Sequence, residues 1–314
     1  MEANKEWIKL VYDLVAIGNP VYDIIRTPHI STKGRILSGC STNACLAAAK
    51  LGMKSVTIIG CIGRNFFNRF INDLEKYGVN SPKVKVSKET GGFKLVYDMS
   101  GNRTLEVLGV AGKITKKDVP DECLNARHIL LGPILQEVDL DLVSFLRETT
   151  KSKIFLDPQG LIRKINPDKQ IVYQSEKETV RKIVNMVDFV KPNEHESIAI
   201  TGTNNPSVSA KTLVDWRSPV GIVTLAEKGS VVFDGEKIVR IPAYKTFAID
   251  PTGAGDVYAG AFIYEYIKTE DVVSSCLFAS AAASIMVEHS GPDFPMGEKE
   301  VRRRLMLLNQ ISSK

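Results

Sequence analysis

Asp250-Pro251-Thr252-Gly253-Ala254-Gly255-Asp256 is the stretch around which this sequence is organised, because it opens a helical pattern over residues 257–267. The first N–H groups of a helix have no partner within the helix, and the helix dipole adds partial positive charge there. Small residues at Gly253, Ala254 and Gly255 let an anion approach those N–H groups, so we expect the loop to hold a phosphate group. A carboxylate beside a phosphate repels it, so we expect Asp256 to take a proton from an attacking hydroxyl.

Gly-Ala-Gly-Asp also fits a plainer interpretation, a turn followed by an acid that complements the helix dipole. Two other nucleotide-binding motifs are absent from the sequence. No run matches the P-loop pattern G-x-x-x-x-G-K-[ST], and Tyr258 stands where the dinucleotide pattern G-x-G-x-x-G needs its last glycine. The combination of an anion loop and an acid therefore favours phosphoryl transfer from a nucleotide to an alcohol.

The pattern D-P-T-G-A-G-D-x-x-x-G over residues 250–260 resembles the C-terminal signature of the ribokinase-like, or pfkB-type, carbohydrate kinases. The resemblance implies a single α/β kinase domain over residues 1–314. Its fold would be a three-layer α/β/α sandwich with a mostly parallel central sheet and a small β-sheet lid. It further implies ATP as the donor, Mg²⁺, and K⁺ held near the anion loop through Asp250 and Thr252.

The composition sets the broad class of the protein. The chain has 314 residues, 44% hydrophobic content and a formal net charge of +5, which suits a large α/β domain and an anionic substrate without requiring nucleic acid. Five cysteines without C-x-x-C spacing indicate buried thiols in a reducing cytosol, hence a cytoplasmic protein. Neither a signal peptide in residues 1–6 nor a membrane span is expected. The basic run 302–304 is expected to form a solvated helix face.

Two polar positions near the N-terminus are candidates for binding the acceptor. Residues 13–18 have the pattern of a buried strand, and Asp23 follows at the edge where parallel sheets bind ligands. Position alone favours an ordinary turn acid. The resemblance favours a site, because similar kinases carry G-x-x-x-x-D, whose acid binds substrate hydroxyls, and G-G-x-x-x-N, whose Asn binds sugar hydroxyls. Gly39 and Asn43 match the second pattern, while Ser38 replaces its first glycine.

A small sheet outside the main fold is predicted from two segments, about 20–37 and 91–109. Residues 92–98 and 103–108 flank a turn and form a hairpin pattern, and residues 24–37 are extended in character. In similar kinases such a sheet is a lid over the sugar and often a dimer contact. The resemblance therefore implies lid closure, which excludes water, and a homodimer formed through the lid.

Further candidates follow later strands, which alternate with helices as in a parallel sheet. Gln159 and Arg163 face the expected ligand edge, although an exposed loop arginine is equally plausible. Asn193 and Glu196 have capping-box spacing, which by itself explains them. Similar kinases use the same N-x-x-E to order the water shell of Mg²⁺ near the phosphates.

The loop after residues 220–225 resembles a T-x-G-x-x-G motif that touches nucleotide phosphates in these kinases. Thr224 and Gly229 match it, and Ala226 replaces a glycine. Lys228 pairs with a phosphate or simply sits in a turn.

Together these residues predict an ATP-dependent kinase that phosphorylates a hydroxyl of a small polyol, with Asp256 as general base. The departures at Ser38, at Ala226 and at Asn65, which stands at the acid position of the family's G-D-x-x-G pattern, keep open a nucleotide-binding regulator with little turnover. An NAD(P) oxidoreductase is disfavoured by Tyr258.

The acceptor itself is left open by the sequence. Residues 18–23 resemble the opening of adenosine-kinase-like members, whereas residues 159–163 resemble members that act on polyols such as inositol. A free sugar, a nucleoside and a cyclitol all fit.

Overall fold

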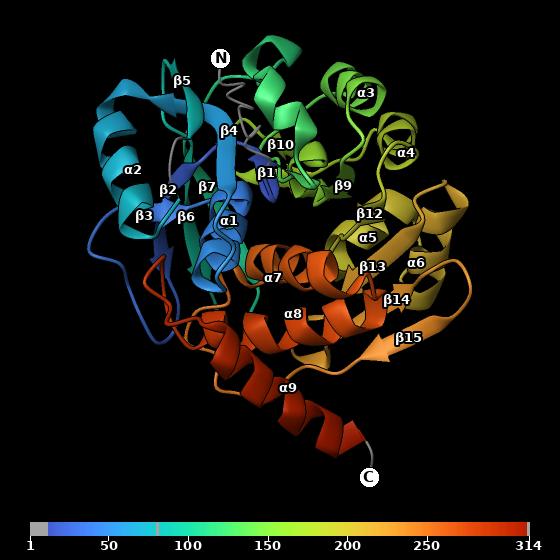
Figure 1. Cartoon of the computed structure of the whole chain (residues 1–314). Helices are drawn as coiled ribbons and strands as arrows, with labels where there is room; N and C mark the ends of the chain where they lie inside the picture. The colour runs from blue at the N-terminus through green and yellow to red at the C-terminus, as the bar shows by residue number, and fades with distance from the viewer. Residues whose placement is uncertain (1–11, 80–81, 313–314) are drawn as a thin grey trace, which may run out of the picture.

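One large sheet runs through the computed structural model, which describes residues 12–79 and 82–312, and helices cover both of its faces (Figure 1). Seven neighbouring strands are parallel, and β14 and β15 continue the sheet antiparallel. In spatial order the strands are β15 (Ile238–Ile241), β14 (Ser230–Phe233), β13 (Val220–Thr224), β12 (Phe189–Val190), β9 (Lys153–Leu156), β8 (His128–Leu131), β1 (Leu14–Ile17), β4 (Val56–Gly63) and β5 (Lys83–Ser87).

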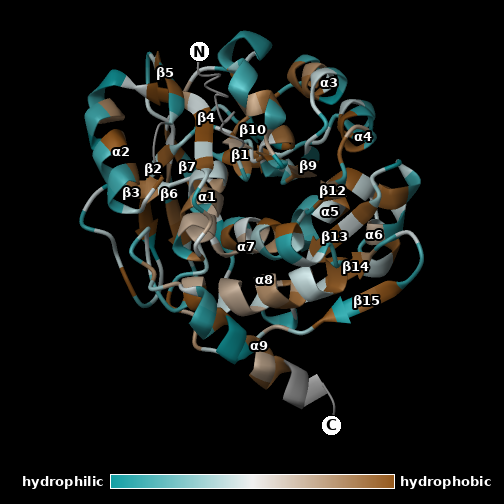
Figure 2. Cartoon of the chain, viewed as in Figure 1, coloured by the Kyte–Doolittle hydropathy of each residue, from teal (hydrophilic) through white to brown (hydrophobic). Residues whose placement is uncertain are grey.

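Side chains alternate between the two faces of this sheet and build two cores. In β1, Leu14 and Ala16 belong to one buried cluster and Val15 and Ile17 to the other. The helices over the first core are α1 (Cys40–Lys50), α2 (Arg64–Lys76), α7 (Ala254–Thr269), α8 (Val272–Val287) and α9 (Glu298–Ser312). Those over the second are α3 (Leu140–Thr149), α4 (Lys177–Val184), α5 (Glu194–Thr201) and α6 (Pro206–Asp215). The predicted three-layer α/β/α fold is confirmed, and Figure 2 shows its hydrophobic strands between helices of mixed hydropathy.

A second, four-stranded sheet arises from the two segments that the sequence singled out. Its order is β3 (Ile36–Ser38), β2 (Val21–Arg26), β6 (Gly92–Tyr97) and β7 (Arg103–Gly109), with a parallel β2–β6 pair at the centre. A hairpin of β10 (Arg163–Ile165) and β11 (Ile171–Tyr173) lies beside β7, where the Val107 N–H donates to the Lys169 carbonyl at 2.8 Å. We call the four strands the small sheet.

Helices α1 and α7 approach each other closely. A Cβ on Gly260 of α7 would lie 2.2 Å from the Ala44 carbonyl oxygen of α1, so only glycine permits this contact. The packing brings Cys40 and Asp256, at the starts of the two helices, together with Asp157, which directly follows β9 at one edge of the central sheet. Ligands of open α/β sheets bind at such an edge.

The basic run of α9 does not form the expected solvated face. Arg302 binds the buried Glu265 through two nitrogens at 2.7 and 2.6 Å, and Arg304 is itself buried against Glu288. Only Arg303 of the three is exposed. The expectation was wrong because Glu265 and Glu288 lie outside α9, 37 residues before Arg302 and 16 residues before Arg304, so the pattern of the helix does not reveal them.

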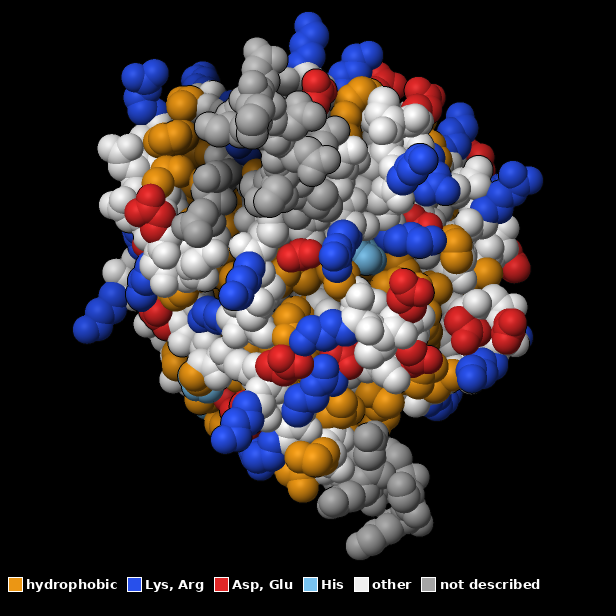
Figure 3. Space-filling view, in the orientation of Figure 1, with side chains coloured by type: hydrophobic (Ala, Val, Ile, Leu, Met, Phe, Trp, Pro, Cys, Tyr) orange, Lys and Arg blue, Asp and Glu red, His pale blue; other side chains and the backbone are white. Residues whose placement is uncertain are grey.

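Several compositional expectations can be compared with the structure. All five cysteines are free and buried, as predicted. On the face seen in Figure 3, Lys and Arg side chains lie among Asp and Glu side chains. Within the described residues, no helix combines the length and apolarity that crossing a bilayer requires. The expectation for residues 1–6 concerns residues outside the described range.

Candidate active site

The Gly253–Gly255 loop leads into α7 and leaves N–H groups available for an anion. Gly253 is the N-cap residue with φ +82°, and no side chain caps the helix. Within the described residues, the N–H groups of Gly255 and Asp256 have no hydrogen-bond acceptor, whereas the Ala254 N–H donates to the Pro251 carbonyl at 3.3 Å. A side chain at Gly253 would also collide, because its Cβ would lie 2.8 Å from the Asn43 amide nitrogen.

Asp256 lies in the first turn of α7 and contacts two other predicted site residues. Asn43 Nδ2 donates to Oδ2 at 2.9 Å, and Gln159 Nε2 donates to Oδ1 at 3.5 Å. Burial raises the pKa of Asp256, and the nearby charge of Asp157 raises it further, while the Asn43 hydrogen bond and Lys191 oppose the shift. The fold thus gathers Asn43, Gln159 and Asp256 around one carboxylate of raised basicity.

A buried ion pair beside Asp256 was not anticipated from the sequence. Lys191 Nζ lies 2.8 Å from Asp157 Oδ2, and each side chain is only 3% exposed. Nζ also lies 3.4 Å from the position of a Cβ on Gly255, so the ammonium faces the anion loop. Burial alone would lower the pKa of Lys191, but the charges of Asp157 and Glu196 outweigh burial and raise it. The sequence did carry one indication of this pair: Asp157 and Lys191 each come directly after a buried strand, where ligand-binding residues of a parallel sheet lie.

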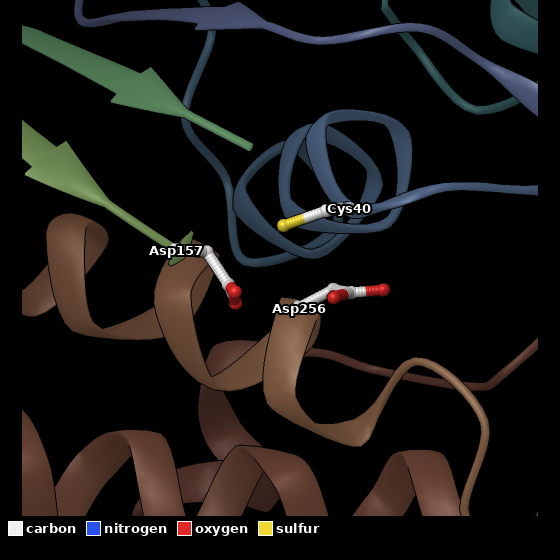
Figure 4. Close-up of side chains that lie close together, drawn as sticks. All are labelled: Cys40, Asp157 and Asp256. Carbon is white, nitrogen blue, oxygen red and sulfur yellow. The ribbon is translucent and has the colours of Figure 1, made fainter. Parts of the chain in front are cut away.

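Cys40 completes this cluster. Figure 4 shows Cys40 at the start of α1, Asp157 after β9 and Asp256 at the start of α7 converging on one space. One atom of each group lies within 4.8 Å of the others. Burial, followed by the charges of Asp157 and Asp256, raises the pKa of the Cys40 thiol well above its ordinary value, so the thiol stays protonated.

Asp23 lies on β2 of the small sheet and is nearly inaccessible to solvent. It accepts a hydrogen bond from the Phe93 N–H at 2.7 Å. Burial raises the pKa of Asp23 to about 6, against the opposing hydrogen bonds from Phe93 and the Ser38 hydroxyl. Ser38, which replaces a glycine of the family pattern, therefore donates a hydrogen bond to Asp23. Gly39 adopts φ +110° as the N-cap of α1, and its carbonyl accepts the Asn43 N–H.

Arg163 is buried at 3% exposure, so the exposed-loop alternative for it is wrong. Its Nη1 donates to the Ile134 carbonyl at a long 3.4 Å, and its Nε has no partner within the described residues. The guanidinium lies 5.9 Å from the centre of the Phe93 ring, on the Asp23 side of the small sheet. A buried donor without a partner costs free energy that a bound acceptor group would recover.

Asn193 and Glu196 form the predicted capping box at the start of α5. The Asn193 N–H donates to Glu196 Oε2 and the Glu196 N–H donates to Asn193 Oδ1, both at 2.9 Å. Burial and the charge of Asp157 raise the pKa of Glu196, so its carboxyl belongs to the same electrostatic environment as Lys191. Thr224 lies alongside, paired with Asn193 in a parallel bridge.

The loop after Thr224 is more peripheral. Lys228 is exposed, and its side chain makes no hydrogen bond or ion pair with the described residues. Gly229 adopts φ +88°, and a Cβ there would lie 2.0 Å from the Ile241 carbonyl oxygen. Local packing thus accounts for this glycine.

Asp250 and Thr252 connect the anion loop to its surroundings. Asp250 Oδ1 accepts the Thr252 N–H at 2.9 Å and Oδ2 accepts the Ser290 hydroxyl at 2.6 Å. The Thr252 hydroxyl lies 3.0 Å from the Tyr97 hydroxyl of β6. The small sheet is therefore hydrogen-bonded to the anion loop.

Known proteins share both the sequence pattern and the fold. The profile of the pfkB family of carbohydrate kinases matches residues 13–299. A cytidine kinase of Thermococcus kodakarensis is 29% identical over 262 residues, covering 82% of this chain and 89% of that protein. A deoxyribokinase of Salmonella typhi is 26% identical over 320 residues, covering 95% and 100%.

Solved structures agree on the architecture. A sulfate complex of a pyrophosphate-dependent kinase in the ribokinase family superposes with a TM-score of 0.79 at 21% identity, covering 92% of this chain and 99% of that one. The chain therefore belongs to the pfkB family of carbohydrate kinases and is a sugar or nucleoside kinase of ribokinase-like fold.

Proposed function

We propose that the protein transfers the γ-phosphoryl group of ATP to a hydroxyl of a small polyol, a sugar, nucleoside or cyclitol, with Asp256 as general base. The observation that carries this proposal is the position of Asp256. It lies in the first turn of α7 beside an uncapped anion loop, oriented by Asn43 and Gln159.

The acceptor is oriented by groups on the small sheet and its neighbours. Asp23 accepts hydrogen bonds from its hydroxyls, and the unpartnered Nε of Arg163 donates to one of its oxygens. The reacting hydroxyl gives its proton to Asp256 as its oxygen attacks the γ-phosphorus, while the bond from the γ-phosphorus to the β–γ bridging oxygen breaks and ADP leaves. The N–H groups of Gly255 and Asp256 and the ammonium of Lys191 stabilise the charge on the transferring group.

The buried oxygens near Lys191 suit a Mg²⁺ ion with its water shell. Magnesium prefers oxygen ligands and retains several waters. The capping box occupies only Oε2 of Glu196, so Oε1 is available to a metal-bound water beside Asn193. When bound, Mg²⁺ neutralises phosphate charge. K⁺ near Asp250 and Thr252, nucleotide contacts by Thr224, Lys228 and Gly229, lid closure by the small sheet and a dimer through it remain proposals from the family resemblance.

The test is phosphorylation of a panel of sugars, nucleosides and cyclitols, with Mg·ATP and with magnesium pyrophosphate as alternative donors. Asp256→Asn should keep nucleotide binding and lower kcat by about 10²–10⁴-fold, the usual contribution of a general base. Asp141→Asn is the matched control, since Asp141 is also an acid in the first turn of a helix, α3. It should cost only the dipole interaction, about 0.3–1 kcal/mol of stability, and leave kcat unchanged.

Each outcome separates the alternatives. A fully active Asp256→Asn variant would exclude the base assignment and favour the plainer role of a helix-dipole acid. Activity with magnesium pyrophosphate but not with Mg·ATP would show that pyrophosphate, and not ATP, is the phosphoryl donor. Nucleotide binding without turnover on any acceptor would favour the regulator.

A further inference from the structure

A groove of about 540 Å³ lies between helix α2 and the small sheet. Its polar lining consists of Arg35, Arg64, Asn65, Lys88, Glu89 and Thr90. None of these residues has a role in the proposed phosphoryl transfer.

The groove lies on the face of the small sheet opposite Asp23. Along β2 successive side chains alternate, so Tyr22 points away from Asp23. The Tyr22 ring contacts Phe66 of α2, with centroids 4.4 Å apart. Arg35 lies on that same side, because its guanidinium carbon lies 4.9 Å from the centre of the Phe66 ring. The backbone of the small sheet therefore separates the groove from the acceptor site.

The base of the groove is held by specific hydrogen bonds. Thr90 Oγ1 accepts the Gly63 N–H at 3.0 Å and donates to Asn65 Oδ1 at 3.0 Å, which joins the start of α2 to the strand segment before β6. Arg35 Nε donates to the Tyr22 carbonyl at 2.7 Å and Nη2 to the Gly91 carbonyl at 2.9 Å. These contacts orient the Arg35 guanidinium and leave Nη1 for a ligand.

The charges in the groove do not balance. Arg35, Arg64 and Lys88 face a single carboxylate, Glu89, whose Oε2 already accepts the Val110 N–H at 3.2 Å. Among the described residues, neither Arg64 nor Lys88 has a side-chain hydrogen bond or ion pair. Helix α2, 13 residues long, begins at the groove with no side-chain cap and no acid in its first turn, so its dipole adds positive potential. Cations brought together without an anionic partner repel one another, and a bound anion would relieve that repulsion.

We propose that this groove binds a phosphate group, as the free ion or as a monoester of a small metabolite, at a site distinct from that of phosphoryl transfer. Guanidinium and ammonium groups around a helix N-terminus match the charge and the acceptor oxygens of phosphate. Arg35 also binds the carbonyl of Tyr22, next to Asp23 in β2, and that of Gly91, just before the strand that carries Phe93. Occupation of the groove is therefore expected to alter the KM for the acceptor.

Calorimetric titration at low ionic strength tests this site directly. The probes are inorganic phosphate and glycerol 3-phosphate, with a non-hydrolysable Mg·ATP analogue present throughout to fill the proposed donor site. The variant is Arg64→Ala with Lys88→Ala, both exposed positions. The matched control is Lys116→Ala with Lys117→Ala, which removes the same charge from exposed positions elsewhere.

We expect saturable binding of at least one probe, weakened about tenfold or more in the Arg64/Lys88 variant and changed less than about twofold in the control. The tighter probe then identifies the free ion or the ester as the ligand. Equal affinities in both variants, or no saturable binding to the unmodified protein, would overturn the proposal. Thermal unfolding of each variant verifies that it is folded.

Discussion

Replacing Lys191 by methionine separates its two predicted roles, stabilising the fold and stabilising the transferring phosphoryl group. Lys191 and Asp157 form an ion pair of 2.8 Å with both side chains 3% exposed. Removing the ammonium leaves the Asp157 carboxylate buried near Asp256 and Glu196 without its counter-charge. Breaking a buried pair in this way costs about 3–5 kcal/mol of unfolding free energy.

The effect on catalysis is estimated from the contact with Gly255. Nζ lies 3.4 Å from the Cβ position of that residue, so a phosphoryl oxygen on the loop would come within about 4 Å of the ammonium. Two unit charges at about 4 Å interact by about 4 kcal/mol at an effective dielectric constant of about 20. If that interaction acts mainly on the transition state, its loss lowers kcat by about 10³-fold.

Urea denaturation and steady-state kinetics measure the two effects separately. Asp157→Asn combined with Lys191→Met removes both charges, so it should recover most of the lost stability but not kcat. Lys153→Met is the matched control, because Lys153 pairs with Asp188 at 3.2 Å while 55% exposed. It should cost less than about 1 kcal/mol and leave kcat unchanged. A double variant that regains full kcat would refute a direct role for Lys191 in phosphoryl transfer.

Three further predictions concern the loop and the core. If K⁺ binds through Asp250 and Thr252, activity is higher in KCl than in a tetramethylammonium salt, and equal rates exclude that site. In Gly253→Ala, the residue at 253 must adopt φ +82° and its Cβ would lie 2.8 Å from Asn43 Nδ2. Urea denaturation should therefore show that the free energy of unfolding falls by about 1–3 kcal/mol, and kinetic assays should show a large fall in kcat. An unchanged kcat would contradict the loop geometry. Burial lowers the pKa of His128 to about 4 from 6.5, so the unfolded chain binds the extra proton first and stability is lost as pH falls from about 6.5 to about 4. The loss of unfolding free energy over this range reaches about 3 kcal/mol. His128→Gln should remove most of this pH dependence, as measured by urea denaturation at several pH values. An unchanged pH dependence in the variant would show that His128 is not its source.

The sequence was most informative where the structure depends on neighbouring residues. The loop at 250–256 was predictable because small residues before a helical pattern define a loop–helix unit on their own. The capping box of Asn193 and Glu196 was predictable for the same reason. Helix α6 carried comparable signals that were missed, since Asn205 caps it and Pro206 occupies its first turn.

Contacts across the fold were not predictable in this way. Asp157 meets Lys191 because β9 and β12 are neighbours in the sheet, which their sequence separation does not reveal. Arg302 was expected to be solvated, but it binds Glu265 of α7, which lies 37 residues earlier in the chain. Arg163 is buried at the start of a two-stranded hairpin whose residues gave no clear strand pattern.

The tight contact between Gly260 and Ala44 divides the enzyme into parts that can evolve at different rates. The contact fixes the helix that carries Asp256 against the helix that carries Asn43. Substitutions at this contact would therefore change the relative position of these two side chains. Asp23 and Phe93 belong to the small sheet, which packs on that rigid pair without sharing its backbone contact. Under the proposed mechanism, substitutions in β2 and β6 would therefore alter which acceptor is bound while the phosphoryl-transfer residues stay in place, and exchanging small sheets between relatives would test this.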